Sequence, residues 1–288
     1  MIPYPEMDPV AFGIGKLQVH WYGLMYLAGF ACAWALAMYR AGKPWAPVKR
    51  NQVEDMIVWA AVGVIVGGRC GYVFIYGMEQ FLEDPVWLFK VWTGGMSFHG
   101  GLIGVILAMS LYAWRIRVNF LSLMDFGAPL VPLGLGFGRL GNFIGQELWG
   151  RPVSGDVPWA MVFPNDPEQL ARHPSQLYEA GLEGVLLFII LFVYSAKPRA
   201  RGTVGALFLI CYGCFRFFVE FYREPDQHIM FDFMGWVTRG QWLSSIMVAS
   251  GLVLFVLFVW RAARLRRAEQ DAASGQETKA DSSVATKA

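Results

Sequence analysis

Residues 132–143 read PLGLGFGRLGNF, an apolar run with four glycines and a single charged side chain, Arg139. The hydrophobic stretch around this run is long enough to lie in a membrane. A guanidinium stays charged at any ordinary pH and is costly at membrane depth, so Arg139 needs a partner or a function there. The glycines let another helix, or a ligand, approach the backbone closely. The run therefore predicts a membrane helix that carries one paired or functional arginine.

The composition of the whole chain also indicates a membrane protein. Its 288 residues are 56% hydrophobic and only 16% charged, whereas a soluble domain carries about 25% charged residues. The net charge of +2 indicates no particular partner, and no nucleic-acid partner is expected. The first apolar segment is longer than the apolar part of a signal peptide and lacks a basic segment before it, so we expect a true span.

Seven apolar segments reach or approach the ~20 residues that a helix needs to cross the hydrocarbon layer. They cover about residues 21–39, 55–77, 95–114, 121–143, 177–195, 203–222 and 241–260. The sequence therefore predicts an all-α integral membrane protein with about seven transmembrane helices. Residues 1–267 are expected to form a single transmembrane domain. Residues 268–288 contain almost no bulky apolar side chains, and we expect a disordered tail there.

The placement of lysine and arginine predicts the orientation of these spans. Basic residues gather after the first, third, fifth and seventh spans. They are Arg40, Lys43, Lys49, Arg50, Arg115, Arg117, Lys197, Arg199, Arg201, Arg261, Arg264, Arg266 and Arg267. By the positive-inside rule these segments are cytoplasmic, which places the N-terminus outside and the C-terminus inside. The two longest non-membrane segments, about 144–176 and 223–240, then lie outside.

Polar residues inside the spans fall at one depth. Counted at ~1.5 Å per residue, they all lie in the outer half although the spans alternate in direction. They are His20, Tyr22, Arg69, His99, Arg139, Asn142, Glu147, Glu179, Glu183, Arg216, Glu220 and Arg223. This predicts a shared polar cavity that opens outward. Asp125 is the exception, because it lies at the cytoplasmic start of a span, where a carboxylate is a plausible helix cap.

Simple ion pairing is an alternative explanation for several of these residues. Glu179 and Glu183 are one helical turn apart, as are Arg216 and Glu220. The sequence leaves open whether these four residues and Arg69 are structural or functional. His20 fits an aromatic belt at the membrane surface equally well.

Neither the histidines nor the cysteines predict a metal or cofactor site. The four histidines are dispersed and lack metal-ligand spacing. Cys211 and Cys214 form a CxxC inside an apolar segment, with no second pair nearby, and we expect inert buried thiols there. His99 stands between the pairs Gly94–Gly95 and Gly100–Gly101, and it is either an interfacial anchor or an exposed functional ring.

An outward cavity with two or more arginines suits a phosphate group, which the planar guanidinium fork binds in a bidentate way. Because the cavity lies in lipid, a phospholipid headgroup is the expected anion. Two classes of function follow: an enzyme that acts on a phospholipid, or a transporter or flippase for an anionic lipid or solute. A transporter needs polar groups along the whole path. The inner half is nearly bare of them, which favours the enzyme.

Four sequence blocks are similar to one known family. They are GRLGNF at 138–143, followed by Glu147; MSFHGGLIG at 96–104; HPSQLYE at 173–179; and FFVEFYREPD at 217–226. With WYG at 21–23, they cover about 220 residues in order. The chain resembles the prolipoprotein diacylglyceryl transferases, which are multi-pass enzymes of the bacterial inner membrane. One minor difference is Ile144, where the family often has a second asparagine.

The resemblance implies the reaction and its partners. The diacylglyceryl group of phosphatidylglycerol is transferred to the lipobox cysteine in the signal peptide of a preprolipoprotein. The products are a thioether-linked lipid and glycerol phosphate, and this is the first step of lipoprotein maturation. The active site is expected on the periplasmic side, without a cofactor, and the nucleophile is the substrate's cysteine.

This chemistry suggests roles for individual residues. Negative charge must be held on the departing phosphate, and we expect Arg139 and Arg223 to clamp it while Asn142 adds a hydrogen bond. Tyr22 is expected to contact the headgroup.

The substrate thiol must also lose its proton. A free thiol with a pKa of about 8.5 is mostly protonated at neutral pH, so a base or a positive field should assist. His99 is the candidate base. The arginine field alone, or Glu147 as the base, is the alternative, and Glu147 is otherwise a partner that orients an arginine.

Overall fold

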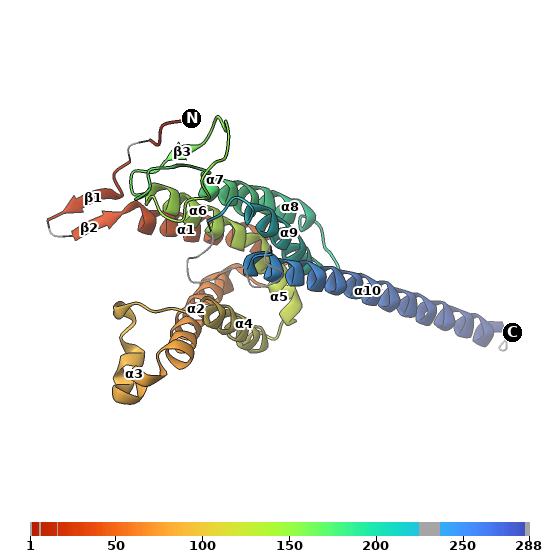
Figure 1. The fold of residues 1–288 in the computed structure, drawn as a ribbon. Coiled ribbons are helices and arrows are strands. Elements are labelled where there is room, and N and C mark those ends of the chain that lie inside the picture. Colours follow the sequence, from red (N-terminus) through yellow and green to blue (C-terminus); the bar gives the residue numbers. More distant parts are fainter. Residues whose placement is uncertain (1, 6, 16, 225–236, 286–288) are drawn as a thin grey trace.

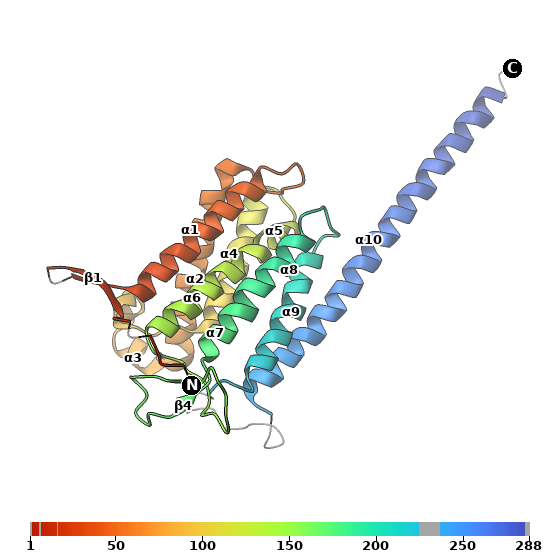
Figure 2. The ribbon, with the colours of Figure 1, turned by 90° about the horizontal axis from the view of Figure 1, so that it is seen from above.

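The computed structural model describes residues 2–5, 7–15, 17–224 and 237–285. Most of its helices lie side by side in a bundle (Figures 1 and 2). One end of the bundle, which we call the loop end, carries the loop of residues 145–174 and the N-terminal segment. The last helix projects beyond the opposite end, which we call the tail end (Figure 2).

The described residues form helices and a few short strands. In chain order these are β1 (Val10–Ile14), β2 (Leu17–His20), α1 (Trp21–Ala41), η1 (Arg50–Gln52), α2 (Val53–Tyr76), α3 (Met78–Glu83), η2 (Pro85–Phe89), η3 (Val91–Thr93), α4 (Phe98–Arg115), α5 (Phe120–Gly127), η4 (Ala128–Leu130), α6 (Val131–Ile144), β3 (Met161–Val162), β4 (Ala171–Arg172), α7 (Ser175–Glu179), η5 (Ala180–Leu186), α8 (Leu187–Tyr194), α9 (Thr203–Val219) and α10 (Arg239–Ala285).

Five helical stretches are long and apolar enough to cross a membrane. They are Trp21–Ala41, Arg50–Tyr76, Phe120–Ile144, Ser175–Tyr194 and Arg239–Gln270. Helix α9 is shorter, with 17 residues, and α4 has 18. A helix thus coincides with each of the seven predicted spans, and the chain is a helical membrane protein. The number of seven crossings and their orientation stay predictions.

Two of the predicted spans are interrupted helices. The fourth consists of α5, the short 3-10 turn η4 and α6. Pro129 and Pro132 lie at this junction, and a proline cannot donate the backbone hydrogen bond that would continue the preceding helix. The fifth contains η5, a wide π-helical turn between α7 and α8. Such turns re-aim side chains and are frequent at functional sites.

The prediction of an all-α chain is wrong in detail, because the structure contains two small antiparallel sheets. Strands β1 and β2 form a hairpin in which Val10 pairs with His20. Gly15 begins its turn with a φ of +62°, a conformation that glycine adopts without a steric penalty. Strands β3 and β4 pair Met161 with Arg172. Both sheets lie outside the apolar segments, so hydropathy carried no signal for them.

Helix α10 runs from Arg239 to Ala285, far beyond the bundle (Figure 2). It therefore includes most of the segment 268–288, for which the composition predicts disorder. The difference has a local cause, because alanine, glutamate, glutamine and lysine, which recur in this segment, are strong helix formers. The predicted disorder of the tail stays a prediction for measurements in solution.

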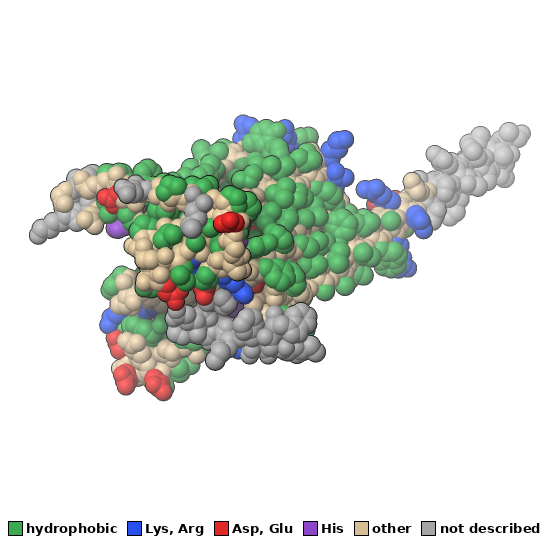
Figure 3. Space-filling model, turned by 45° about the horizontal axis from the view of Figure 1, so that its top comes forward, with side chains coloured by type: hydrophobic (Ala, Val, Ile, Leu, Met, Phe, Trp, Pro, Cys, Tyr) green, Lys and Arg blue, Asp and Glu red, His purple; other side chains and the backbone are tan. Residues whose placement is uncertain are grey.

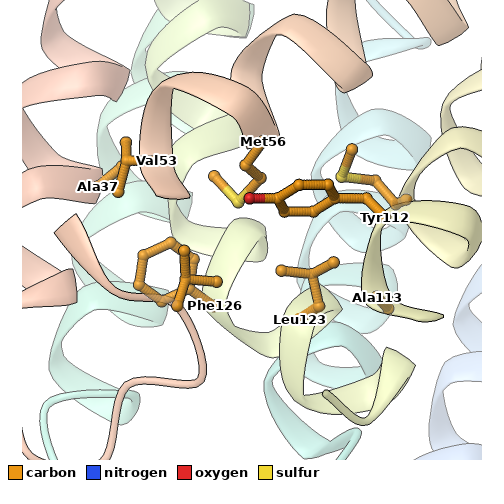
Figure 4. Packing of buried hydrophobic residues seen from close by; sticks show 9 residues of the cluster. Ala37, Val53, Met56, Tyr112, Ala113, Leu123 and Phe126 are labelled. Carbon is orange, nitrogen blue, oxygen red and sulfur yellow. The ribbon is translucent and has the colours of Figure 1, made fainter. Parts of the chain in front are cut away.

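A hydrophobic core near the tail end joins four helices. Figure 4 shows Ala37 of α1, Val53 and Met56 of α2, Tyr112 of α4 and Phe126 of α5 together. Helix α2 packs along α4, α1 along α6, and α9 along α10. Away from these contacts the surface is apolar, and Figure 3 shows a broad hydrophobic band over the middle of the bundle. This surface fits a lipid environment.

The cysteines are not all buried in the protein, contrary to the prediction. Cys32 and Cys214 are exposed on helix surfaces, while Cys70 and Cys211 are half-buried. Cys211 packs against the core cluster that includes Leu187 and Leu191.

Two charged residues have structural partners that the sequence did not predict. Arg69 is buried and donates hydrogen bonds to the backbone carbonyls of Trp87, Leu88, Lys90, Gly94 and Gly95. It thereby holds the loop between α3 and α4 and does not join the other arginines.

Asp125 caps a helix other than its own. Its carboxylate accepts hydrogen bonds from the backbone N–H groups of Gly202 (2.6 Å) and Gly205 (2.9 Å), at the start of α9. The side chain of Asn119 caps α5 instead. Asp125 is thus a helix cap, as the sequence suggested, but it caps α9 rather than the helix that contains it.

Candidate active site

Three arginines and three glutamates meet in one cluster at the loop end of the bundle. The carboxylate of Glu179 pairs with Nε of Arg139. It also lies 3.3 Å from Nη1 of Arg216 and 3.8 Å from Nε of Arg223. The arginines come from α6, from α9 and from the segment directly after α9. Four of the polar side chains that the sequence places at one depth therefore lie together in the structure, while a shared cavity among them stays a prediction.

The other two glutamates complete the cluster. Nη2 of Arg216 lies 3.3 Å from Glu220, and its Nη1 lies 3.9 Å from Glu183. Glu220 also lies 4.0 Å from Arg223 and accepts a hydrogen bond from the hydroxyl of Thr238 at 3.1 Å. Arg216 thus contacts all three carboxylates. Ion pairing accounts for the positions of Glu183, Arg216 and Glu220, which is the alternative that the sequence left open. The same ion pairs place these side chains in one cluster with Arg139.

The local fold explains why α6 and the π-helical turn meet here. Gly136 faces Gly184, and a Cβ on Gly184 would lie only 2.6 Å from the Cα of Gly136. Two glycines therefore allow the two backbones to touch. This approach brings Arg139, one turn after Gly136, to the carboxylate of Glu179. The glycine-rich run that opened the sequence analysis is thus a helix-packing surface with an arginine at its end.

Asn142 and Glu147 lie together on the turn that follows α6. Nδ2 of Asn142 donates a hydrogen bond of 2.7 Å to Oε1 of Glu147. Gln146 and Leu148, on either side of Glu147, have φ values of 54° and 58°, which non-glycine residues rarely adopt. Gln176 donates to the backbone carbonyl of Glu147 at 2.8 Å. The turn is thus held in a strained form that presents the Glu147 side chain.

Glu147 lines an open hollow of about 540 Å³. The other lining residues are Pro9, His20, Tyr22, Gly23 and Gly145. The hydroxyl of Tyr22 lies 3.0 Å from that of Tyr26. The structure therefore places Tyr22 and His20 at the same hollow as Glu147, which is bonded to Asn142. A contact of these residues with a headgroup stays a prediction.

The backbone of Arg223 is fixed by the loop of residues 145–174. Gly150 forms a bridge with Arg223, and Nε of Arg151 donates to the carbonyl of Arg223 at 2.8 Å. A Cβ on Gly150 would lie 2.6 Å from the carbonyl oxygen of His173. Only glycine allows this approach. Most of the predicted segment 223–240 lies outside the described residues.

A buried ion pair stabilises the same loop. Arg172 pairs with Asp166 at 2.6 Å and reaches Glu224, next to Arg223, at 3.2 Å. Burial raises the pKa of Asp166. Hydrogen bonds from Arg172 and from the backbone N–H groups of Glu168 and Leu170 outweigh this effect and hold the pKa below its ordinary value. These ion pairs thus hold the loop in a fixed conformation next to the cluster.

His99 lies apart from these residues. It is exposed at the start of α4, and its ring contacts that of Phe98 at a centroid distance of 5.6 Å. In the part of the chain that the structure describes, His99 makes no ion pair or hydrogen bond with the arginine cluster. Helix α4 packs on α2 and α5 instead. The structure therefore does not unite the candidate base with the phosphate-binding candidates.

Sequence reasoning missed the central position of Arg216. The signals were its place at the common depth and its spacing of four residues from Glu220. The loop end thus offers three guanidinium groups in one cluster, and an oriented amide and carboxylate at the turn after α6, where the carboxylate lines an open hollow. This arrangement can bind a phosphate ester and stabilise negative charge that develops on it.

Comparison with known proteins gives one consistent result. Residues 9–257 match the family model described as prolipoprotein diacylglyceryl transferase. The chain is 57% identical to the phosphatidylglycerol–prolipoprotein diacylglyceryl transferase of Teredinibacter turnerae, over 96% of this chain and 99% of that protein. It is 54% identical to the protein of the same name from Pseudomonas putida, over 88% and 95%. It is 52% identical to that from Azotobacter vinelandii, over 92% and 99%.

Proposed function

The chain belongs to the prolipoprotein diacylglyceryl transferase family and transfers a diacylglyceryl group from phosphatidylglycerol to prolipoproteins, and we propose that it does so at the cluster of Arg139, Arg216 and Arg223. Membership decides between the two functions that the sequence allowed, in favour of the enzyme over the transporter or flippase. The observation that supports the site is the single carboxylate of Glu179, which gathers three arginines.

The transfer exchanges one bond for another. The sulfur of the lipobox cysteine forms a bond to the terminal glycerol carbon of the diacylglyceryl group. The bond between that carbon and the phosphate oxygen breaks, and its electron pair stays on the phosphate. The thiol proton passes to a base, and glycerol phosphate leaves. The step therefore needs charge stabilisation at the phosphate and proton removal at the thiol.

Arg139 and Arg223 hold the phosphate in this proposal. The guanidinium of Arg139 pairs with Glu179 through its Nε atom, so its terminal nitrogens are the part of the fork that binds the incoming anion. Arg223 lies at the other oxygen of Glu179, with its Nε 3.8 Å from that carboxylate. Asn142, oriented by Glu147, adds a hydrogen bond. Tyr22, at the hollow, contacts the headgroup. Negative charge on the leaving phosphate is thus met by fixed positive groups.

His99 accepts the thiol proton in this proposal. Its exposed position at the start of α4 makes it accessible to a signal peptide that arrives through the surrounding lipid. The phosphate is held on α6 and after α9, while the base is carried by α4. Deprotonation by the arginine field alone, or by Glu147, is the alternative that the pH dependence tests.

We place the enzyme in the bacterial inner membrane with the site on the periplasmic side. The N-terminus is outside and the C-terminus cytoplasmic in this arrangement. The support is the distribution of charge, since Lys and Arg side chains gather at the end from which α10 projects (Figure 3). The arginine cluster lies at the opposite, loop end.

The substitution Arg139→Lys tests the proposed site. Lysine keeps the positive charge but lacks the planar fork. In a detergent assay with phosphatidylglycerol and a lipobox peptide, we expect the variant to lose most of its turnover, on the order of 10²-fold. Arg261→Lys, at an exposed position in α10, is the matched control and should retain normal turnover. Near-normal turnover of Arg139→Lys would remove Arg139 from the chemistry.

A further inference from the structure

Glu179 is the acidic residue that contacts three arginines in the described part of the chain. Its Oε2 pairs with Nε of Arg139, while its Oε1 lies between Arg216 and Arg223. The side chain is only 2% exposed. A buried carboxylate at the meeting point of three guanidinium groups determines both where they point and how much positive charge the site presents.

The neighbouring glutamates do not duplicate this position. Glu183 contacts Arg216 alone, at 3.9 Å, and Glu220 contacts Arg216 and Arg223. Among the described residues, Glu179 provides the ion pair of Arg139. Among the ion pairs of the described residues, removing its charge would therefore leave Arg139 without a carboxylate partner, whereas Arg216 would retain Glu183 and Glu220, and Arg223 would retain Glu220.

The ion pair also leaves most of the Arg139 fork for a ligand. A guanidinium has five N–H donors, and the contact through Nε uses the one that is not on the terminal nitrogens. The Arg139 side chain is 21% exposed, so part of it faces outward while Glu179 holds it from the buried side. This geometry fixes the direction of the fork before any phosphate arrives.

Charge balance matters because substrate and product differ in charge. The phosphodiester of phosphatidylglycerol carries one negative charge. The released phosphate monoester carries about −1.5 to −2 at neutral pH. Three arginines without compensation would therefore bind the product more tightly than the substrate. A fixed carboxylate among the arginines weakens the binding of both anions. It weakens the binding of the more highly charged product more than that of the substrate.

We propose that Glu179 is a positioning residue that directs the Arg139 fork toward the lipid phosphate and offsets enough positive charge for glycerol phosphate to leave. This role rests on the proposed function, in which Arg139 and Arg223 bind that phosphate. Glu179 acts through the arginines and does not touch the reacting atoms.

Two substitutions separate the two effects. Glu179→Gln keeps the size of the side chain and removes its charge. Glu179→Asp keeps the charge and shortens the reach to Nε of Arg139. The measurement is steady-state transfer from phosphatidylglycerol to a lipobox peptide in detergent, with glycerol phosphate added as inhibitor. We expect Glu179→Gln to lower the inhibition constant of glycerol phosphate about tenfold or more. Glu179→Asp should lower kcat about tenfold and leave that constant within about twofold of the parent value.

Glu168→Gln is the matched control, because Glu168 pairs with Arg172 on the exposed loop, outside the cluster. It should leave both constants unchanged. An inhibition constant for Glu179→Gln within about twofold of the parent value overturns the proposal, because a purely structural carboxylate changes stability and kcat but not the affinity for a dianion. If Glu179→Gln yields no folded protein, Glu179→Asp decides, and a kcat near the parent value overturns the proposal.

The proposed function fails by a different result. It is refuted if glycerol phosphate does not inhibit the parent enzyme, or if Arg139→Lys retains near-normal turnover. If glycerol phosphate inhibits the parent enzyme and Arg139→Lys loses turnover, an unchanged inhibition constant in Glu179→Gln rejects only the proposed role of Glu179.

Discussion

The buried side chain of Asn142 donates a hydrogen bond of 2.7 Å to the exposed carboxylate of Glu147, across the turn that ends α6. The pair connects the glycine-rich helix with the open hollow. The sequence allowed Glu147 to orient an arginine. In the structure its side chain pairs instead with Asn142, and the carboxylate lines the open hollow.

Asn142→Asp should lower turnover about 10- to 100-fold. The substitution keeps the shape of the side chain but removes the amide donor and places a second carboxylate beside Glu147. A hydrogen bond to a charged group contributes about 1.5–3 kcal/mol, which corresponds to this range. Transfer assays on Asn142→Asp, Glu147→Gln and the double variant check it. The double variant should be less impaired than the product of the two single effects, because the two side chains act as a unit. Strictly multiplicative effects would show that the pair is not coupled.

His99→Gln should change the dependence of kcat/KM on pH. If His99 is the base, the acidic limb of the parent enzyme's pH profile depends on this side chain, and the variant lacks that limb. Because the ring is exposed, added imidazole should restore part of the turnover of His99→Ala. An unchanged pH profile in His99→Gln, with no rescue by imidazole, would assign deprotonation to Glu147 or to the arginine field.

Arg172→Gln should destabilise the protein and reduce the acid sensitivity of its stability. The folded-state pKa of Asp166 lies below the ordinary value, mainly because hydrogen bonds, first that from Arg172, outweigh the effect of burial. The contribution of this pair is therefore complete above the ordinary aspartate pKa of about 4 and is lost as the pH falls through the folded-state value.

This predicts a loss of about 1–3 kcal/mol at neutral pH for Arg172→Gln, and a smaller further loss on acidification than in the parent. The midpoint of thermal unfolding in detergent, measured between about pH 7 and pH 3, checks both effects. Arg201→Gln, an exposed arginine near the tail end, is the control. Equal acid dependence in parent and Arg172→Gln would show that the pair does not contribute.

Gly150→Ala should impair both folding of the loop and transfer. The added methyl group would collide with the carbonyl oxygens of Tyr222 and His173, two rigid backbone groups. The bridge that positions the backbone of Arg223 would then open. We expect increased proteolysis within residues 145–174 and a large loss of turnover. Gly127→Ala is the control, because a Cβ at Gly127 meets no atom within 4 Å. Normal proteolysis and turnover in Gly150→Ala would show that the loop does not hold Arg223 in place.

Much of the site was predictable from the sequence because membrane depth is a property that can be counted along the chain. The rise per residue placed Arg139, Glu179, Arg216 and Arg223 at one level, and the structure confirms that they meet. The same count placed Arg69 in the group and was wrong there. Arg69 points to the backbone of its own following loop, and depth alone does not show in which direction a side chain points.

The sequence by itself determined that this chain is a helical membrane protein, where its apolar helices lie, and that a glycine-rich helix carries an arginine needing a partner. These conclusions rest on hydropathy and spacing, which are properties of a local stretch of sequence and do not depend on contacts with distant segments. Only the tertiary structure decided that Glu179 joins three arginines, that Asp125 caps another helix, and that His99 lies apart from the cluster. Such pairings depend on how helices rotate and shift against one another. That arrangement is set by contacts between distant segments, such as Gly136 against Gly184, and not by local pattern.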